Sequence, residues 1–116
     1  LICIAKTANK CYADGRIISK EEFHRDVIRY LENSEVVYYC GDLFLINTPI
    51  THLPDNLSVG GDLYLRDTKI TKLPDNLSVG GGLYLVNTPL TKKYTKEQIR
   101  QMIKDKGGNV DGSIIV

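Results

Sequence analysis

Few side chains in this sequence have the types and spacing that catalysis requires. The two histidines are His24, on the polar flank of a predicted helix, and His52, at a repeat position that is otherwise Lys72 or Lys92. Such positions are typical of solvated surface groups rather than of general bases. No serine lies in a Gly-x-Ser-x-Gly motif, and no cysteine adjoins a histidine. We therefore expect no catalytic residue and no enzymatic activity.

Metal and phosphate chemistry has equally little support in the sequence. Cys3, Cys11 and Cys40 form no Cys-x-x-Cys pair, and the histidines are too few to complete a zinc site. An Asp-Gly pair at 14–15 superficially resembles part of a calcium loop, but a lysine and a tyrosine occupy its first ligand positions. The glycine pairs lack the lysine and hydroxyl of a phosphate-binding loop. We expect no metal and no cofactor.

Three aromatic residues are better placed for binding. Phe44, Tyr64 and Tyr84 recur every 20 residues between pairs of leucines that we expect to point inward, so the rings should point outward and stack. Rigid amphipathic rings often dominate interfaces. The alternative is a column that only stabilises the fold, or one buried under the N-terminal segment. The predicted recognition face comprises Phe44, Tyr64, Tyr84, Asp42, Asp62, Ile46, Arg66 and Val86.

A second candidate surface is basic. Residues 90–106 carry six basic and two acidic side chains, a net charge of 6 − 2 = +4, within a chain whose net charge is +1. Such a patch could contact nucleic acid or an acidic protein, although most charged helix faces are simply solvated. Its predicted members are Lys92, Lys93, Lys96, Arg100 and Lys104.

The aromatic spacing belongs to a tandem repeat. Cys40–Val59 and Gly60–Val79 align without gaps and share 14 of 20 residues, and a third copy begins at Gly80 and departs from the pattern at Lys93. Each copy has a short Leu-x-Leu strand, an Asn-Thr or Asp-Thr turn, an extended Leu-Pro stretch and a Leu-x-Val segment. One copy cannot bury its own apolar face, but stacked copies can shield one another.

These copies resemble the 20-residue leucine-rich repeat of bacterial and phage-encoded proteins. The matching frame is L-x-L-x-x-T-x-I-x-x-L-P-x-x-L, with the wording L-P-D-N-L-S-V-G-G-x-L-Y-L, over residues 40–92. Thr48, Thr68 and Thr88 stand where the family usually has asparagine, so we expect a threonine ladder inside the stack. The resemblance implies a recognition scaffold.

The segment before the repeats should form an N-terminal cap. Ser19 and Glu22 fit a capping box for a helix over 19–33, with an apolar stripe along one face. Residues 1–13 suit a helix, although residues 1–4 would also suit a strand. Val37 and Tyr39 lie 20 residues before Leu57 and Val59, so this stretch can be a degenerate half-repeat.

The segment after the repeats should form a C-terminal cap. Thr95 and Gln98 predict a second capping box, and Gly107 a left-handed stop. Residues 113–116 should then add a strand beside 83–85. The predicted α/β fold is a short right-handed leucine-rich-repeat-like solenoid with a parallel β-sheet. It divides into an N-terminal helical cap (1–35), the repeats (36–92) and a C-terminal helix with the last strand (93–116), all one folding unit.

Composition sets outer limits on the class of protein. With 116 residues, 42 % apolar and 25 % charged, the chain matches a single globular domain, and no apolar run is long enough to span a bilayer. The first residue is Leu rather than Met, so we expect a trimmed start or a longer chain, without a signal sequence. The odd cysteine count leaves at least one thiol free or intermolecular, which favours a reducing, cytoplasmic location.

Together these features predict a non-enzymatic protein-binding module. It could be phage-encoded and act on a host protein, such as a defence component, in the bacterial cytoplasm. One alternative is a nucleic-acid-contacting protein that uses the basic cap, and another is a structural or glycan-contacting domain of a larger protein. We expect a protein partner and no membrane, and the open C-terminal edge could pair two copies.

Overall fold

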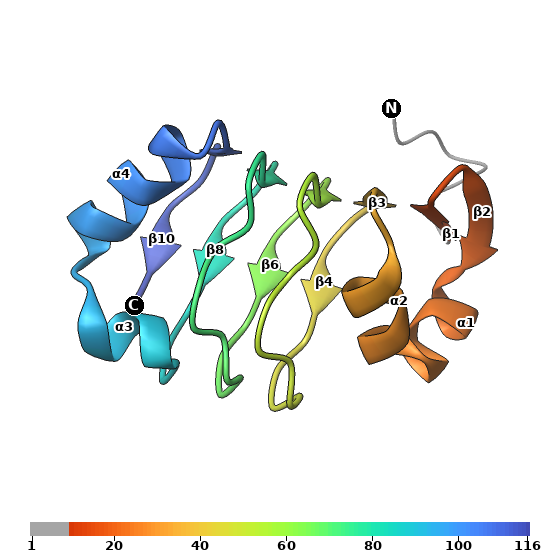
Figure 1. Cartoon of the computed structure of the whole chain (residues 1–116), viewed down its shortest axis with the longest axis horizontal. Helices are drawn as coiled ribbons and strands as arrows, with labels where there is room; N and C mark the ends of the chain where they lie inside the picture. Colours follow the sequence, from red (N-terminus) through yellow and green to blue (C-terminus); the bar gives the residue numbers. More distant parts are fainter. Residues whose placement is uncertain (1–9) are drawn as a thin grey trace.

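The computed structural model describes residues 10–116 as a mixed α/β fold with parallel strands and four short helices. Figure 1 shows strands β4, β6, β8 and β10 side by side, with helices α3 and α4 at one end of the molecule and the hairpin β1–β2 with helices α1 and α2 at the other. The N-terminal elements are β1 (Lys10–Ala13), β2 (Arg16–Ser19), α1 (Lys20–Arg25), α2 (Val27–Asn33) and β3 (Val37–Tyr39). The later ones are β4 (Leu43–Phe44), β5 (Ser58–Val59), β6 (Leu63–Tyr64), β7 (Ser78–Val79), β8 (Leu83–Tyr84), α3 (Pro89–Lys93), α4 (Lys96–Asp105), β9 (Asn109–Val110) and β10 (Ile114–Ile115).

The repeats lie side by side in parallel and in register. Leu43 pairs with Leu63, Leu63 with Leu83, and Leu83 with Ile114, so a residue faces its counterpart 20 positions later in the repeats. All four side chains are at most 1 % exposed. The predicted last strand beside 83–85 is therefore confirmed as β10.

Each repeat contributes to two sheets, whereas the sequence predicted one. The four-stranded sheet has the order β10-β8-β6-β4, and a six-stranded sheet has the order β2-β1-β3-β5-β7-β9. The Leu-x-Val segments of the first two repeats form β5 and β7 in the second sheet. Tyr39 pairs with Val59, so the predicted half-repeat before Cys40 is confirmed as β3.

Left-handed Asn and Asp residues form the corners between these strands. Asn47, Asp67 and Asn87 have φ of 58°, 59° and 58°, and Asn56 and Asn76 have φ of 65° and 57°. Asn and Asp tolerate this backbone region better than other residues with a Cβ, because their short side chains bond locally. The recurrence of these two residue types explains how successive repeats turn identically.

The threonines close each turn locally and do not form the predicted ladder between repeats. The hydroxyls of Thr48, Thr68 and Thr88 donate to the carbonyl three residues earlier in the same repeat, at 2.8, 2.7 and 2.8 Å. Side chains that do link one repeat to the next lie at the corners instead, where Asn87 Nδ2 donates to Asp67 Oδ1 at 2.7 Å. The threonine side chain is shorter than that of asparagine, and its hydroxyl bonds only within its own turn.

Thr68→Val is expected to lower the free energy of unfolding by about 1 kcal/mol, because valine keeps the shape of threonine but loses the hydroxyl donor. Thr68 is only 4 % exposed, so water cannot replace that bond. Urea denaturation measures the loss. Thr48→Val, at the half-buried equivalent position in the first repeat, is the control and should lower the free energy of unfolding by less. An equal loss for both variants would contradict the claim that burial strengthens the effect of the Thr68 hydrogen bond.

The N-terminal region differs from its prediction as a helical cap. Residues 1–9 of the predicted 1–13 helix lie outside the described residues, and 10–13 is a strand that forms an antiparallel hairpin with β2. Asp14 (φ 49°) and Gly15 (φ 86°) make the turn. The predicted 19–33 helix is two helices, separated at Asp26, where φ is −129° and ψ 41°. Ser19 does cap α1, because its Oγ accepts the amide of Glu22 at 3.0 Å.

The C-terminal region follows its prediction closely. Thr95 and Gln98 form the predicted capping box of α4, with bonds of 3.2 and 2.8 Å, and Gly107 is left-handed with φ of 79°. One additional turn of helix, α3, precedes it and is capped by Thr88. Within residues 10–116, no helix has the length and apolar character needed to cross a membrane.

Candidate functional site

The three predicted aromatic residues form a continuous stack on the outer side of the four-stranded sheet. The ring centres of Phe44 and Tyr64 are 4.6 Å apart with planes 5° from parallel, and those of Tyr64 and Tyr84 are 4.5 Å apart and 13° from parallel. This spacing is close to the distance between adjacent strands, about 4.8 Å. The rings therefore stack face to face because the strands beneath them are in register, and their edges point to solvent.

Apolar exposure is concentrated at both ends of this stack. Phe44 is 55 % exposed and its neighbour Ile46 is 44 % exposed, while Tyr64 and Tyr84 are half-buried. At the far end, Ile115 is in register with Tyr84 and is 37 % exposed. We define the recognition face as the predicted outward residues together with Ile115. The sequence analysis did not include Ile115 in this face. The predicted alignment of Ile114 with Leu83 already placed Ile115 beside Tyr84.

Asp42 and Asp62, predicted as part of the face, link one repeat to the next. Asp42 Oδ1 accepts the amide of Asp62 at 2.7 Å, and Asp62 Oδ1 accepts the amide of Gly82 at 2.7 Å. The other oxygen of Asp62 accepts the hydroxyl of Tyr64 at 3.0 Å. In the third repeat Gly82 replaces the aspartate, so Tyr84 lacks this partner. These carboxylates position the ring stack as well as border it.

The hydrogen bond to Asp62 raises the pKa of Tyr64 to about 12, with smaller contributions from burial and nearby charges. We expect Asp62→Asn to return this pKa toward the ordinary value of 10.0, because the amide cannot repel a phenolate. NMR of ring-labelled tyrosine would resolve the titration. Since the folded state holds this proton more tightly, its stabilising effect is complete below pH 10 and is lost as the pH rises through about 12. A Tyr64 pKa unchanged by Asp62→Asn would contradict the assignment, and Asp42→Asn is the control.

The other flank of the recognition face has mixed character. Arg66 is exposed, and its Nε lies 3.4 Å from an oxygen of Asp67 in the adjacent residue. Val86 is half-buried beside it in the third repeat. The structure thus brings the predicted outward residues onto one side of the sheet, and only Arg66 interrupts its apolar flank with a charge.

The predicted basic patch is spread over two helices at the C-terminal end. Lys92 and Lys93 belong to α3, whereas Lys96, Arg100 and Lys104 belong to α4. The four lysines are exposed. Arg100 is half-buried, and its guanidinium donates to the carbonyl of Gly112 at 3.2 Å, so it holds the last strand rather than projecting to solvent.

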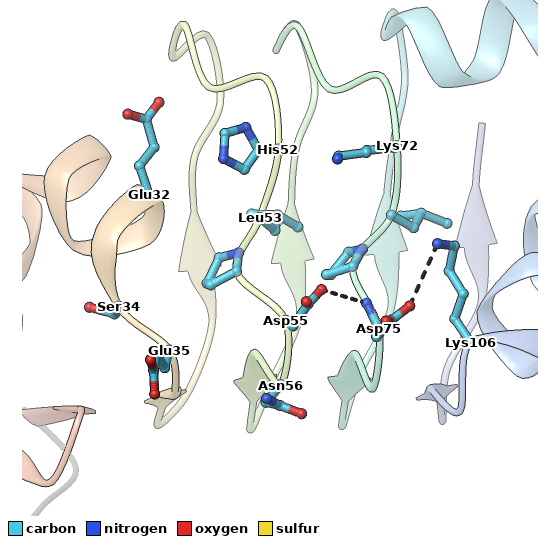
Figure 2. A pocket seen from close by; sticks show the side chains of 13 residues that line it. Glu32, Ser34, Glu35, His52, Leu53, Asp55, Asn56, Lys72, Asp75 and Lys106 are labelled. Atoms are coloured by element: carbon cyan, nitrogen blue, oxygen red, sulfur yellow. Dashed lines mark hydrogen bonds and ion pairs between the residues drawn. The ribbon is translucent and has the colours of Figure 1, made fainter.

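A polar groove of about 610 Å³ runs over the Leu-Pro stretches of the first two repeats. Figure 2 shows Glu32 and Glu35 on one side and Lys106 on the other, with His52 and Lys72 from adjoining repeats between them. At one end of the groove, Lys106 Nζ forms an ion pair with Asp75 at 3.6 Å. The sequence did not predict the groove. Its walls come from the helical regions at the two ends of the molecule, and the repeat period does not show where those regions pack against the repeats.

The two histidines occupy different environments. His24 Nε2 lies 2.8 Å from the hydroxyl of Tyr39, and its ring packs edge-on against Tyr39 and Phe23. Burial lowers the pKa of His24, and the nearby Lys20 lowers it further. His24 is thus an exposed side chain, as predicted, although its ring also contacts Tyr39 and Phe23. His52 lines the groove, and its Nδ1 lies 3.2 Å from the hydroxyl of Thr51.

Of the two cysteines in the described residues, Cys11 is a free thiol and Cys40 is disulfide-bonded. Cys11 is 2 % exposed, and burial raises its pKa to about 12, so it stays protonated and unreactive near neutral pH. Within residues 10–116, no group of three or more His, Cys, Asp or Glu side chains is arranged to hold a metal ion.

Comparisons of the chain with protein-family models, with curated protein sequences and with solved structures each found no match. A functional assignment therefore rests on the side chains of the chain itself. The recognition face carries three of the large hydrophobic side chains that are exposed within residues 10–116, Phe44, Ile46 and Ile115, and it is the candidate site.

Proposed function

We propose that the chain is a non-enzymatic protein-binding module and that the recognition face is its binding surface. The observation that carries this proposal is the exposure of Phe44 beside Ile46 at the end of a rigid ring stack. Exposed apolar patches of this kind mark interaction sites, and aromatic anchors supply much of the binding energy at interfaces. The stack is already ordered, so a partner need not immobilise the rings.

The orientation of the rings favours a protein over a glycan. A sugar packs its C–H groups on the face of an aromatic ring, but both faces of Tyr64 are covered by neighbouring rings. At the centre of the stack only ring edges and hydroxyls are left for the partner, and these suit the side chains of a protein surface; the outer face of Phe44 is the one ring face of the stack left open at the β4 end within residues 10–116. The basic patch supports a nucleic-acid partner less well, because Arg100 is engaged within the fold.

We also infer that the repeats form a short right-handed solenoid of the leucine-rich-repeat type. The 20-residue period and the parallel register of Leu43, Leu63 and Leu83 support it. A bacterial or phage origin, a host defence protein as the target and a cytoplasmic location stay predictions that rest on the resemblance. Cysteine usage no longer supports a reducing location, because Cys40 is disulfide-bonded.

The test is the double replacement of Tyr64 and Tyr84 by alanine, with both thermal melting and partner capture measured. We expect the double variant to lose the proteins that the wild-type chain captures from a bacterial lysate, because the centre of the face is removed. Ile17→Ala removes an exposed apolar side chain in the hairpin, away from the ring stack, and is the control. Lost stability with unchanged capture would show that the rings serve only the fold.

A further inference from the structure

The four-stranded sheet ends at β4, whereas the six-stranded sheet continues beyond β5 to β3 and the hairpin. The amides of Leu43 and Leu45 donate to the carbonyls of Asp62 and Tyr64 at 2.8 and 2.9 Å, so the amide of the intervening Phe44 points away from β6. Within the described part of the chain, no strand pairs with this outer edge of β4. An unpaired edge is a template for strand addition by another chain.

Two side-chain columns also begin at this edge. In the carboxylate column, Asp42 accepts the amide of Asp62, but no carboxylate in residues 10–116 accepts the amide of Asp42 itself. In the ring column, Phe44 has Tyr64 on one face and no stacked ring of residues 10–116 on the other. Within residues 10–116, the edge thus presents an amide donor without an acceptor and a ring face without a stacked ring, two residues apart. An added strand that repeated the chemistry of β6 would use both.

A cation lies next to the amide of Asp42. A β-carbon placed on Gly41 would be 3.2 Å from Lys20 Nζ, which also lies 4.8 Å from the centre of the Tyr39 ring. No carboxylate within residues 10–116 forms an ion pair with Lys20. A carboxylate that accepted the Asp42 amide would therefore enter the field of an ammonium group, and charge-assisted hydrogen bonds are the stronger ones.

We infer, building on the proposed function, that the outer edge of β4 binds an extended segment of a partner protein with an acidic residue two positions before an aromatic one. The segment adds as a parallel strand. Its carboxylate accepts the Asp42 amide beside Lys20, and its ring stacks on the open face of Phe44. The second repeat carries this pattern in Asp62-Leu63-Tyr64, which makes the same contacts with the third repeat.

A synthetic peptide with the sequence of residues 61–68 is the probe, titrated into the full ¹⁵N-labelled chain. We expect saturable shifts of the Asp42 and Phe44 amide signals. Peptides with Asp62→Ala or Tyr64→Ala should bind roughly five- to tenfold more weakly, because each loses one anchor. In the protein, Lys20→Gln should weaken binding, while Lys10→Gln, an exposed lysine in β1, should leave it unchanged.

Absence of shifts at Asp42 and Phe44 with millimolar peptide would overturn the inference, as would shifts confined to β10 or equal binding of all three peptides. Self-association of the chain that protects the Phe44 amide would overturn it too, because a second copy would then occupy the edge. The proposed function fails separately: it fails if the Tyr64 and Tyr84 double variant keeps its captured proteins, whatever the peptide does.

Discussion

Leu65→Ala is expected to lower the free energy of unfolding by about 3–4 kcal/mol, the range for truncating a fully buried leucine. Leu65 is 0 % exposed in the second repeat, and its counterparts Leu45 and Leu85 are equally buried in the repeats on either side. A cavity at this position is closed in by repeats on both sides and cannot collapse easily. Urea denaturation followed by circular dichroism measures the loss.

Ile17→Ala is the matched control for this substitution, because Ile17 is 58 % exposed. Its effect should stay within about 0.5 kcal/mol, as for most surface replacements. A loss at Leu65 no larger than at Ile17 would contradict a shared core between the repeats.

Gly80→Ala is expected to cost about 3 kcal/mol, at the upper end of the effects of overpacking. A β-carbon at Gly80 would overlap the carbonyl oxygen of Gly60, its counterpart in the preceding repeat. The amide of Gly80 donates to Val59 at 2.8 Å, so the two backbones cannot separate without breaking the hydrogen bonds that join the repeats. The measurement is again the free energy of unfolding.

Gly15→Ala separates this clash from the general cost of replacing a glycine. No atom lies within 4 Å of a β-carbon placed there, but its φ of 86° strains alanine by about 1–2 kcal/mol. We expect the loss at Gly80 to exceed the loss at Gly15. The opposite order would mean that the repeats do not approach as closely as the structure shows.

Most of what the sequence predicted correctly about the fold came from the 20-residue repeat. A gap-free period of 20 allows parallel stacking in only one register, so the pairing of Leu43 with Leu63 and the outward column at Phe44 followed from the sequence. The capping box at Thr95 is a local signal with a direct physical cause, and it was also predicted correctly.

The N-terminal elements were predicted less well, because no repeat constrains them. An Asp-Gly pair between two apolar segments is a strong hairpin signal, and 14–15 form that turn. The helical interpretation of 10–13 overlooked it. The break at Asp26 and the groove near His52 depend on how the ends pack against the repeats, which local pattern does not encode. Thr68 bonds within its own turn because its side chain is short, and the resemblance to a repeat with asparagine at this position did not predict that bond.

Parallel stacking of the repeats in register is the claim on which the ring stack and both binding proposals depend. Nuclear Overhauser effects between the backbone protons of neighbouring strands test it most directly. We expect contacts that connect residue 44 with 64 and residue 64 with 84, together with contacts between the rings of Phe44 and Tyr64. A well-dispersed spectrum in which residues 43–45, 63–65 and 83–85 show contacts only to other partners would contradict the account.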